Sequence, residues 1–76
     1  MVCVISGFPG IVPKESVKKL FSHFGKVVAV NKAYGAGTAM VEMSKDYEEL
    51  EAVHFLNKSK WMGYKISVEK SFAPYG

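Results

Sequence analysis

The stretch Gly37-Thr38-Ala39-Met40-Val41-Glu42-Met43 decides how this chain folds. Its length and apolar content are typical of a buried β-strand, and the glycine-rich segment 35–37 before it predicts a tight turn. The segment 27–34, on the other side of that turn, also has the composition of a strand. Because a short glycine-supplied turn joins neighbouring strands, we expect 27–34 and 38–43 to pair antiparallel.

One residue does not fit the pattern of the strand predicted at 27–34. Val28 and Val30 fall on the same face, which should be buried. Lys32 is in register with them, where a core residue is expected. Either its stem passes the edge of a helix and carries the ammonium group to water, or the strand is bulged.

The residues before this pair of strands predict a strand and a helix. The apolar run 2–6 is bounded by Gly7 and Pro9-Gly10, which is typical of a strand that leads into a loop. Pro13 then opens a helix at its favoured first-turn position, and Gly25 stands where the helix should end. The apolar face of this helix is Val17, Leu20, Phe21 and Phe24.

The residues after the pair predict a second helix and a last strand. Ser44 or Asp46 can cap the helix, and its acidic first turn suits the helix dipole. Met62-Gly63 then turns the chain into a strand over 64–69, where apolar and polar residues alternate. The residues expected on the inner face of the second helix are Leu50, Val53 and Leu56.

This order of elements is βαββαβ. It predicts an α+β ferredoxin-like sandwich, in which two helices cover one face of a four-stranded antiparallel sheet. We expect one domain over 1–71 and a short C-terminal tail over 72–76. Because the helices cover only one face of such a sheet, function should lie on the open face.

Composition limits the partners of the chain. The net charge is +3, and all ten basic residues are lysine, which favours diffuse attraction to phosphate over bidentate recognition. No stretch approaches the ~20 apolar residues of a membrane span, so no membrane partner is expected. Met1 leads directly into a strand-like run, which gives no sign of a signal peptide. The single cysteine favours an intracellular setting.

The chain also lacks the residues of an active site or a metal centre. Cys3 is the only cysteine, so it cannot form an internal disulfide or, alone, a structural zinc site. We find no Ser/His/Asp or Cys/His nucleophile set, and His23 and His54 fall on separate predicted helices. We therefore predict that the protein is not an enzyme and that it uses no metal or cofactor.

Several segments, in order, resemble the RNA recognition motif (RRM). Residues 37–43 are similar to its RNP1 signature, K/R-G-F/Y-G/A-F-V-x-F/Y. Cys3-Val4-Ile5-Ser6-Gly7-Phe8-Pro9 is similar to the partner segment RNP2. Other matches are Leu20-Phe21-Ser22-His23-Phe24-Gly25-Lys26-Val27 at the end of the first helix, Phe55-Leu56-Asn57 at the end of the second, and Gly63-Tyr64-Lys65-Ile66-Ser67-Val68 at the last strand. The resemblance covers nearly the whole chain and implies a module that binds single-stranded RNA.

Three positions depart from the usual RRM signature. Val4, Thr38 and Met40 stand where the stacking aromatic residues are expected. Residues 38–43 and the short turn at 35–37 are similar instead to the noncanonical RRMs of polypyrimidine-tract-binding protein, hnRNP L and the matrin-type nuclear proteins. That resemblance implies a nuclear, hnRNP-like protein that acts in mRNA processing and in the regulation of splicing. Such proteins often bind pyrimidine-rich strands and usually carry further RRMs.

The resemblance also implies how the sheet is oriented. Cys3, Ile5, Ala39, Val41 and Met43 would face the helices. Because the face lacks stacking rings, binding should rely on hydrogen bonds and lysines, and Glu42 would repel phosphate. We expect the isolated domain to be a monomer with modest RNA affinity. The residues predicted to bind RNA are Val4, Ser6, Asn31, Thr38, Met40, Lys65, Ser67, Lys70, Phe72 and Tyr75.

Several alternatives stay open. Phe72 and Tyr75 either stack on a base or pack on the sheet and block it, and the sequence favours neither. Trp61 most simply caps the core beneath the loop before the last strand. A protein-interaction RRM with little or no RNA binding is the alternative function, because Val4 and Met40 make an apolar patch without stacking geometry. The lysines expected to be solvated on the first helix are Lys14, Lys18 and Lys19.

Overall fold

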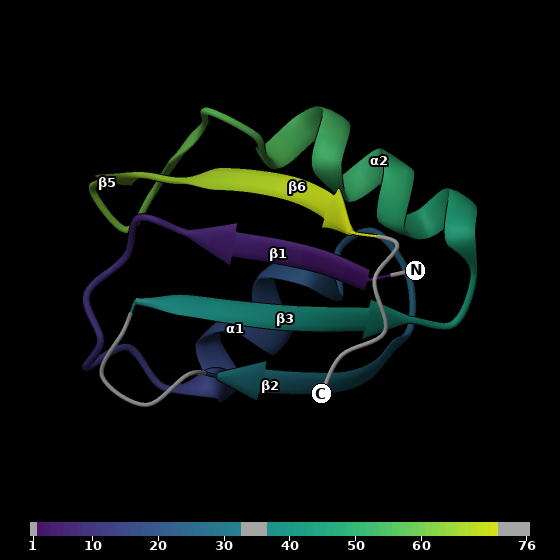
Figure 1. The fold of residues 1–76 in the computed structure, drawn as a ribbon, viewed down its shortest axis with the longest axis horizontal. Coiled ribbons are helices and arrows are strands. Elements are labelled where there is room, and N and C mark those ends of the chain that lie inside the picture. Colours follow the sequence, from purple (N-terminus) through teal and green to yellow (C-terminus); the bar gives the residue numbers. More distant parts are fainter. Residues whose placement is uncertain (1, 33–36, 72–76) are drawn as a thin grey trace.

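The computed structural model of this chain describes residues 2–32 and 37–71. Four strands form one antiparallel sheet in the order β2-β3-β1-β6 (Figure 1). The strands are β1 (Val2–Ser6), β2 (Val27–Lys32), β3 (Thr38–Met43) and β6 (Ser67–Ser71). The antiparallel pairing predicted across 35–37 is confirmed, since Asn31 lies opposite Met40.

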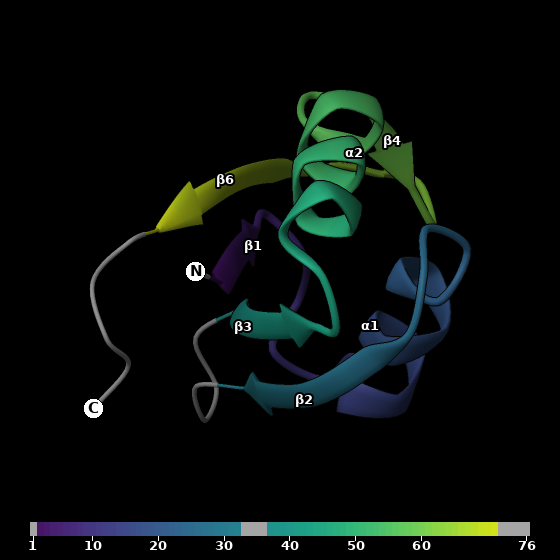
Figure 2. The same cartoon turned by 90° about the vertical axis from the view of Figure 1, so that its right-hand side faces the viewer.

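Both helices lie on the same face of this sheet. Figure 2 shows α1 (Lys14–Phe21) and α2 (Asp46–Leu56) side by side on one side of the strands. The predicted ferredoxin-like α+β sandwich is therefore confirmed. Neither helix in the described part of the chain is long and apolar enough to cross a membrane.

The core lies between the helices and the sheet. The residues predicted to face the helices are buried there: Cys3, Ile5, Ala39, Val41 and Met43. Phe21 and Val17 of α1 pack against this layer with no exposed surface. The apolar repeat of α1 and the alternation of side chains along β1 and β3 thus direct one face of each element into the core.

The strand β2 contains a bulge, which corrects the expectation for Val28. The register shifts between Val27 and Ala29, so Val28 is an extra residue and its side chain is 56% exposed rather than buried. Beyond the bulge, Val30 lies opposite buried Val41 as expected. Lys32 is half-buried on the same side, and its ammonium group donates a hydrogen bond to the Gly10 carbonyl.

The helix ends differ from the predicted ones. Helix α1 ends at Phe21, and Gly25 lies in the turn beyond it. Lys45, rather than Ser44 or Asp46, is the N-cap residue of α2, and its side chain makes no capping hydrogen bond. The carboxylate of Glu48 reaches back instead, and its Oε1 accepts hydrogen bonds from the Ser44 hydroxyl at 2.8 Å and the Lys45 N–H at 3.2 Å. The acidic residue in the first turn thus satisfies the backbone N–H of the N-cap residue, as the N3 glutamate of a capping box does.

The inner face of α2 is rotated from the predicted one. Leu50 is 43% exposed, whereas Glu49, Ala52 and Leu56 are buried. Val53 packs against the edge of the core. The helix therefore buries a carboxylate where the sequence pattern predicts a leucine.

The predicted last strand is interrupted. The chain forms a two-stranded hairpin, β4 (Lys60–Trp61) and β5 (Tyr64–Lys65), before β6 begins at Ser67. Met62 and Gly63 make its turn with φ values of 52° and 83°, as predicted for this pair. Ile66 lies between β5 and β6 in the chain and is fully buried, so it fixes the junction of these two strands to the core.

Candidate nucleic-acid interface

The outer face of the sheet presents two cross-strand rows of side chains. The first, which we call the hydroxyl row, is Thr38, Ser6 and Ser67, where Ser6 lies opposite both of the others. The second, the middle row, is Asn31, Met40, Val4 and Glu69. Because side chains alternate along a strand, these residues point away from the buried layer that contains Ile5 and Val41.

The structure brings six of the predicted RNA-binding residues together on this face. They come from all four strands and are exposed or half-buried, so a ligand can reach them. Val4, Thr38 and Met40 occupy outward positions, as the resemblance implied. The six residues are Val4, Ser6, Asn31, Thr38, Met40 and Ser67.

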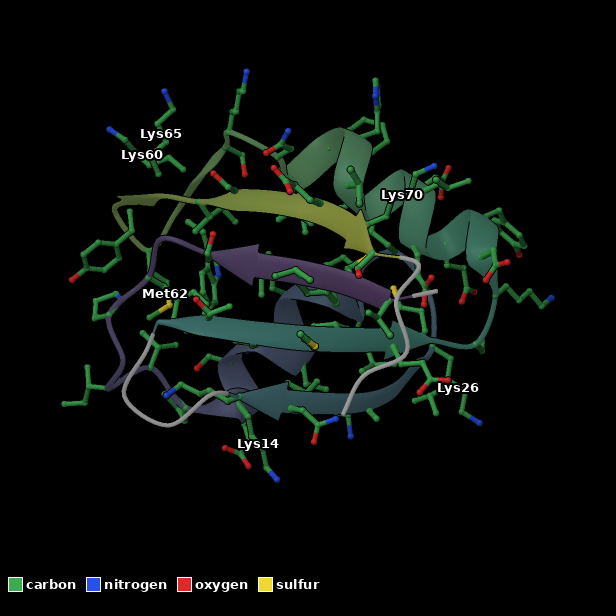
Figure 3. All side chains as sticks on the ribbon, in the orientation of Figure 1. Lys14, Lys26, Lys60, Met62, Lys65 and Lys70 are labelled. Carbon is green, nitrogen blue, oxygen red and sulfur yellow. The ribbon has the colours of Figure 1, made fainter. Side chains whose placement is uncertain are left out.

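The two lysines predicted to bind RNA lie in different places. Lys65 is exposed on the β4–β5 hairpin, opposite Lys60. Lys70 lies opposite buried Cys3, so its position in the strand directs it toward the face that carries the helices. Figure 3 shows Lys70 beside α2 and Lys65 at the other end of β6. The tail residues Phe72 and Tyr75 lie outside the described residues.

Glycine at position 7 brings the hairpin close to the hydroxyl row. Gly7 follows Ser6 directly and has φ +99°, a backbone conformation that residues with a side chain rarely adopt. A Cβ atom at this position would lie 2.7 Å from the Lys65 carbonyl oxygen. The end of β1 therefore runs against the backbone of the hairpin, and Lys65 begins next to the Ser6–Ser67 pair.

Two carboxylates of the sheet are placed away from the hydroxyl row, and we call them the acidic pair. Glu69 lies opposite Val4, and Glu42 lies opposite Ala29. The sequence predicts Glu42 on this face, and the structure adds Glu69. The alternation of residues 64–69 contains the signal for it, because Glu69 has the same parity as Ser67.

The hairpin also contains residues that the sequence reasoning did not include. Lys60 lies opposite Lys65, and Figure 3 shows both lysines projecting from the corner of the molecule where β6 begins. Tyr64 is 44% exposed on the same hairpin. The Met62-Gly63 turn is the signal that could have predicted this pairing, because a two-residue turn places its flanking residues opposite each other.

A separate hollow lies between α1 and the hairpin. Its volume is about 320 Å³ and its lining is mostly apolar. Trp61 belongs to this lining and also packs edge-on against Phe8, with ring centroids 5.9 Å apart. Trp61 thus caps the core as expected, and part of it contributes to a surface that is distinct from the sheet face. The other lining residues are Ser16, Lys19, Leu20, His23 and Met62.

Behind the sheet, Glu49 is a buried carboxyl group. Its Oε2 accepts a hydrogen bond from the Met43 N–H at 3.0 Å, and its backbone carbonyl accepts one from the Cys3 thiol at 3.5 Å. Burial raises the pKa of the Glu49 carboxyl above its usual range, although the Met43 hydrogen bond opposes this shift. Burial, together with Glu49, raises the pKa of Cys3 to about 12. Cys3 is therefore a protonated core residue rather than a reactive thiol.

Comparison with known proteins identifies the family. The model of the RNA recognition motif family matches residues 4–67. The protein RbpB of Nostoc sp. (strain PCC 7120), named as an RNA-binding protein, is 33% identical over 66 residues, which are 79% of this chain and 64% of RbpB. This chain thus spans less than two thirds of the length of that relative.

Solved structures show the same fold. The structure of RNA Binding Protein PG1 has a TM-score of 0.89 and 18% identity, and the match covers 100% of this chain and 99% of that chain. The RRM of Rna15 with bound GU RNA has a TM-score of 0.84 and 19% identity over 95% of this chain and 83% of that chain. The family model spans most of the sequence and the fold agrees with it, so this chain belongs to the RNA recognition motif family.

Proposed function

We propose that this chain binds single-stranded RNA through the outer face of its sheet. One observation supports the proposal most directly: four strands place Val4, Ser6, Asn31, Thr38, Met40 and Ser67 on a single face, opposite the one that α1 and α2 cover. The corresponding surface of an RRM binds single-stranded RNA, whose bases contact the side chains of the sheet. Membership of the family agrees with this choice of partner.

Binding through this face would not use the usual stacking rings. Each base stacked on an aromatic ring contributes about 1–3 kcal/mol, and Val4 and Met40 offer only apolar contact in its place. Thr38, Asn31 and the serines offer hydrogen bonds, and lysines hold phosphates. We therefore expect weaker binding by the isolated domain than by an RRM with three rings.

Nuclear magnetic resonance tests the proposal. Isotope-labelled protein is titrated at low salt with pyrimidine-rich and mixed oligonucleotides, and the amide shifts are mapped on the structure. We expect the largest shifts at residues of the hydroxyl row and the middle row. Shifts confined to the helices, or no shifts at all, would mean that the outer face is not an RNA-binding surface.

Finer features of the function rest on sequence resemblance. The similarity of residues 38–43 to the polypyrimidine-tract-binding group favours a pyrimidine-rich strand and a nuclear role in mRNA processing, within a larger protein. The relative RbpB comes from a cyanobacterium, which has no nucleus, so the RNA-binding proposal does not depend on the compartment. The domain boundary at residue 71, the tail contacts and the monomeric state stay predictions.

A second candidate function is the binding of a protein segment. The hollow between α1 and the hairpin, with Trp61 and the 59% exposed Met62 in its lining, favours this alternative. A salt series separates the two functions. RNA binding should weaken with salt, with a log–log slope of about −0.7 for each phosphate held. If no oligonucleotide binds at low salt, protein binding becomes the better proposal.

A further inference from the structure

The charged groups of the outer face are not evenly distributed. The hydroxyl row lies at the end of the sheet where β1 ends and where β3 and β6 begin (Figure 1). Lys60 and Lys65 project from the corner next to this end. The acidic pair, Glu42 and Glu69, lies farther along β3 and β6. One end of the face can therefore attract phosphate, whereas the rest of it repels phosphate.

The hydroxyl row is suited to contact a nucleotide. Among the described residues, the Ser6 and Ser67 hydroxyls have no hydrogen-bond partner, and the two residues lie directly opposite each other. A serine hydroxyl both donates and accepts hydrogen bonds, so it can meet either kind of group on a base or a ribose. Thr38 continues the row on the other side of Ser6.

Strand geometry gives the separation of the two charged regions. Ser67 and Glu69 are two residues apart on β6, which corresponds to about 7 Å along the strand. Thr38 and Glu42 are four residues apart on β3, or about 13 Å. Because the Debye length is about 8 Å at physiological salt, Glu69 acts on a phosphate at the hydroxyl row and Glu42 is mostly screened from it. Glu69 thus marks the limit of the favourable region.

We propose that the phosphates of single-stranded RNA bind at one end of this sheet only, on Lys60 and Lys65. Its bases or riboses lie on the hydroxyl row, and Glu69 keeps phosphates away from the middle row. This inference rests on the proposed RNA-binding function and specifies its location. It also assigns a binding role to the β4–β5 hairpin.

Two matched double variants test the position of the phosphates. The variant Lys60→Gln/Lys65→Gln removes both hairpin lysines. The control Lys14→Gln/Lys26→Gln removes the same charge from positions that Figure 3 places away from this corner. Affinity for a short oligouridine, measured by fluorescence anisotropy over a salt series, should fall only in the hairpin variant, and its log–log slope should become shallower by about 0.7 for each phosphate that the variant no longer holds. Equal effects of the two variants would overturn the proposal, because net charge alone would explain them.

Single variants test the limit that Glu69 sets. Glu69→Gln should tighten binding about twofold at low salt, as expected for one like charge removed at about 7 Å in water. Glu42→Gln should have a smaller effect at the same salt concentration, because Glu42 lies farther from the hydroxyl row. The reverse order, or amide shifts as large at Ala29 and Glu42 as at Ser6 and Ser67, would overturn the proposal.

The outcomes distinguish this proposal from the proposed function. If the wild-type chain binds no oligonucleotide at low salt, both are wrong. If it binds through the outer face but the hairpin lysines do not matter, only the one-ended site is wrong. Thermal unfolding of each variant should match that of the wild type, since all the substituted side chains are exposed.

Discussion

The two faces of the sheet differ sharply although the same four strands build both. On the inner face, Ile5, Val41 and Val68 have no exposed surface. On the outer face, Val4 and Met40 are half-buried between polar neighbours. Because successive side chains of a strand point to opposite faces, the inner residues can specify the fold while the outer residues stay available for a ligand. The comparison predicts that adjacent residues of one strand should respond very differently to substitution.

The largest difference should appear between two neighbours in β1. Ile5→Ala leaves a cavity in the core and should lower the free energy of unfolding by about 2–5 kcal/mol. Val4→Ala, on the outer face, should lower it by about 1 kcal/mol or less. Denaturant unfolding measures both. If Ile5→Ala fails to fold, Ile5→Val should still cost about 0.5–1.5 kcal/mol. Equal costs at the two positions would contradict the assignment of the faces.

The second-largest loss of stability should come from a substitution at Gly37, the residue that precedes β3. Gly37 has φ +64°, and a Cβ atom there would lie 2.1 Å from the Phe8 carbonyl oxygen. Gly37→Ala should therefore cost about 2–3 kcal/mol, through backbone strain and displacement of Phe8. Gly63 is the control, because it also has positive φ but nothing lies within 4 Å of its Cβ position. Gly63→Ala should cost about 1 kcal/mol, and equal unfolding midpoints for the two variants would refute the steric argument.

Adding a ring to the outer face should strengthen RNA binding. Met40 lies between Asn31 and Val4 in the middle row, so Met40→Phe supplies a stacking surface there. We expect affinity to rise by about 1–3 kcal/mol for each base that stacks, measured by anisotropy with a short oligouridine. Leu50→Phe adds the same ring to exposed α2 and should change nothing. Equal gains in the two variants would indicate nonspecific adhesion instead.

The smallest expected effect concerns a polar group behind the inner face. Burial raises the pKa of Glu49 in the folded protein above its unfolded value. Its contribution to stability is therefore complete below the unfolded pKa, about 4.3, and is lost as the pH rises through the folded pKa. Compared with Glu49→Gln, the wild type should lose stability over that range. Urea unfolding of both chains at several pH values measures the difference. Parallel curves would show that Glu49 does not titrate with a raised pKa.

The regular parts of this fold could be predicted from the sequence. The resemblance to the RRM predicted which residues of β1 and β3 are buried, and the Met62-Gly63 pair predicted the turn that follows Trp61. These features depend on neighbours in the chain, whose period and turn chemistry are local properties. The six candidate residues on the outer face follow from the same resemblance.

Other features could not be predicted because they depend on contacts between distant segments. The bulge that exposes Val28 depends on the register between β2 and β3. The rotation of α2, which buries Glu49 and exposes Leu50, depends on how the helix packs over β1 and β3. Periodicity alone favoured the leucine, because it contains no information about a hydrogen bond from Met43.

The sequence by itself determined the order of elements, the family and the absence of rings at Val4, Thr38 and Met40. These features depend on residue type and on spacing along the chain, and folding changes neither. Only the tertiary structure decided which side chains share a surface. It placed Lys60 and Lys65 together at the corner where β6 begins, turned Lys70 toward the helices, and put Glu69 opposite Val4. Cross-strand pairing brings together residues that are tens of positions apart, so the charge pattern of the outer face exists only in the folded chain.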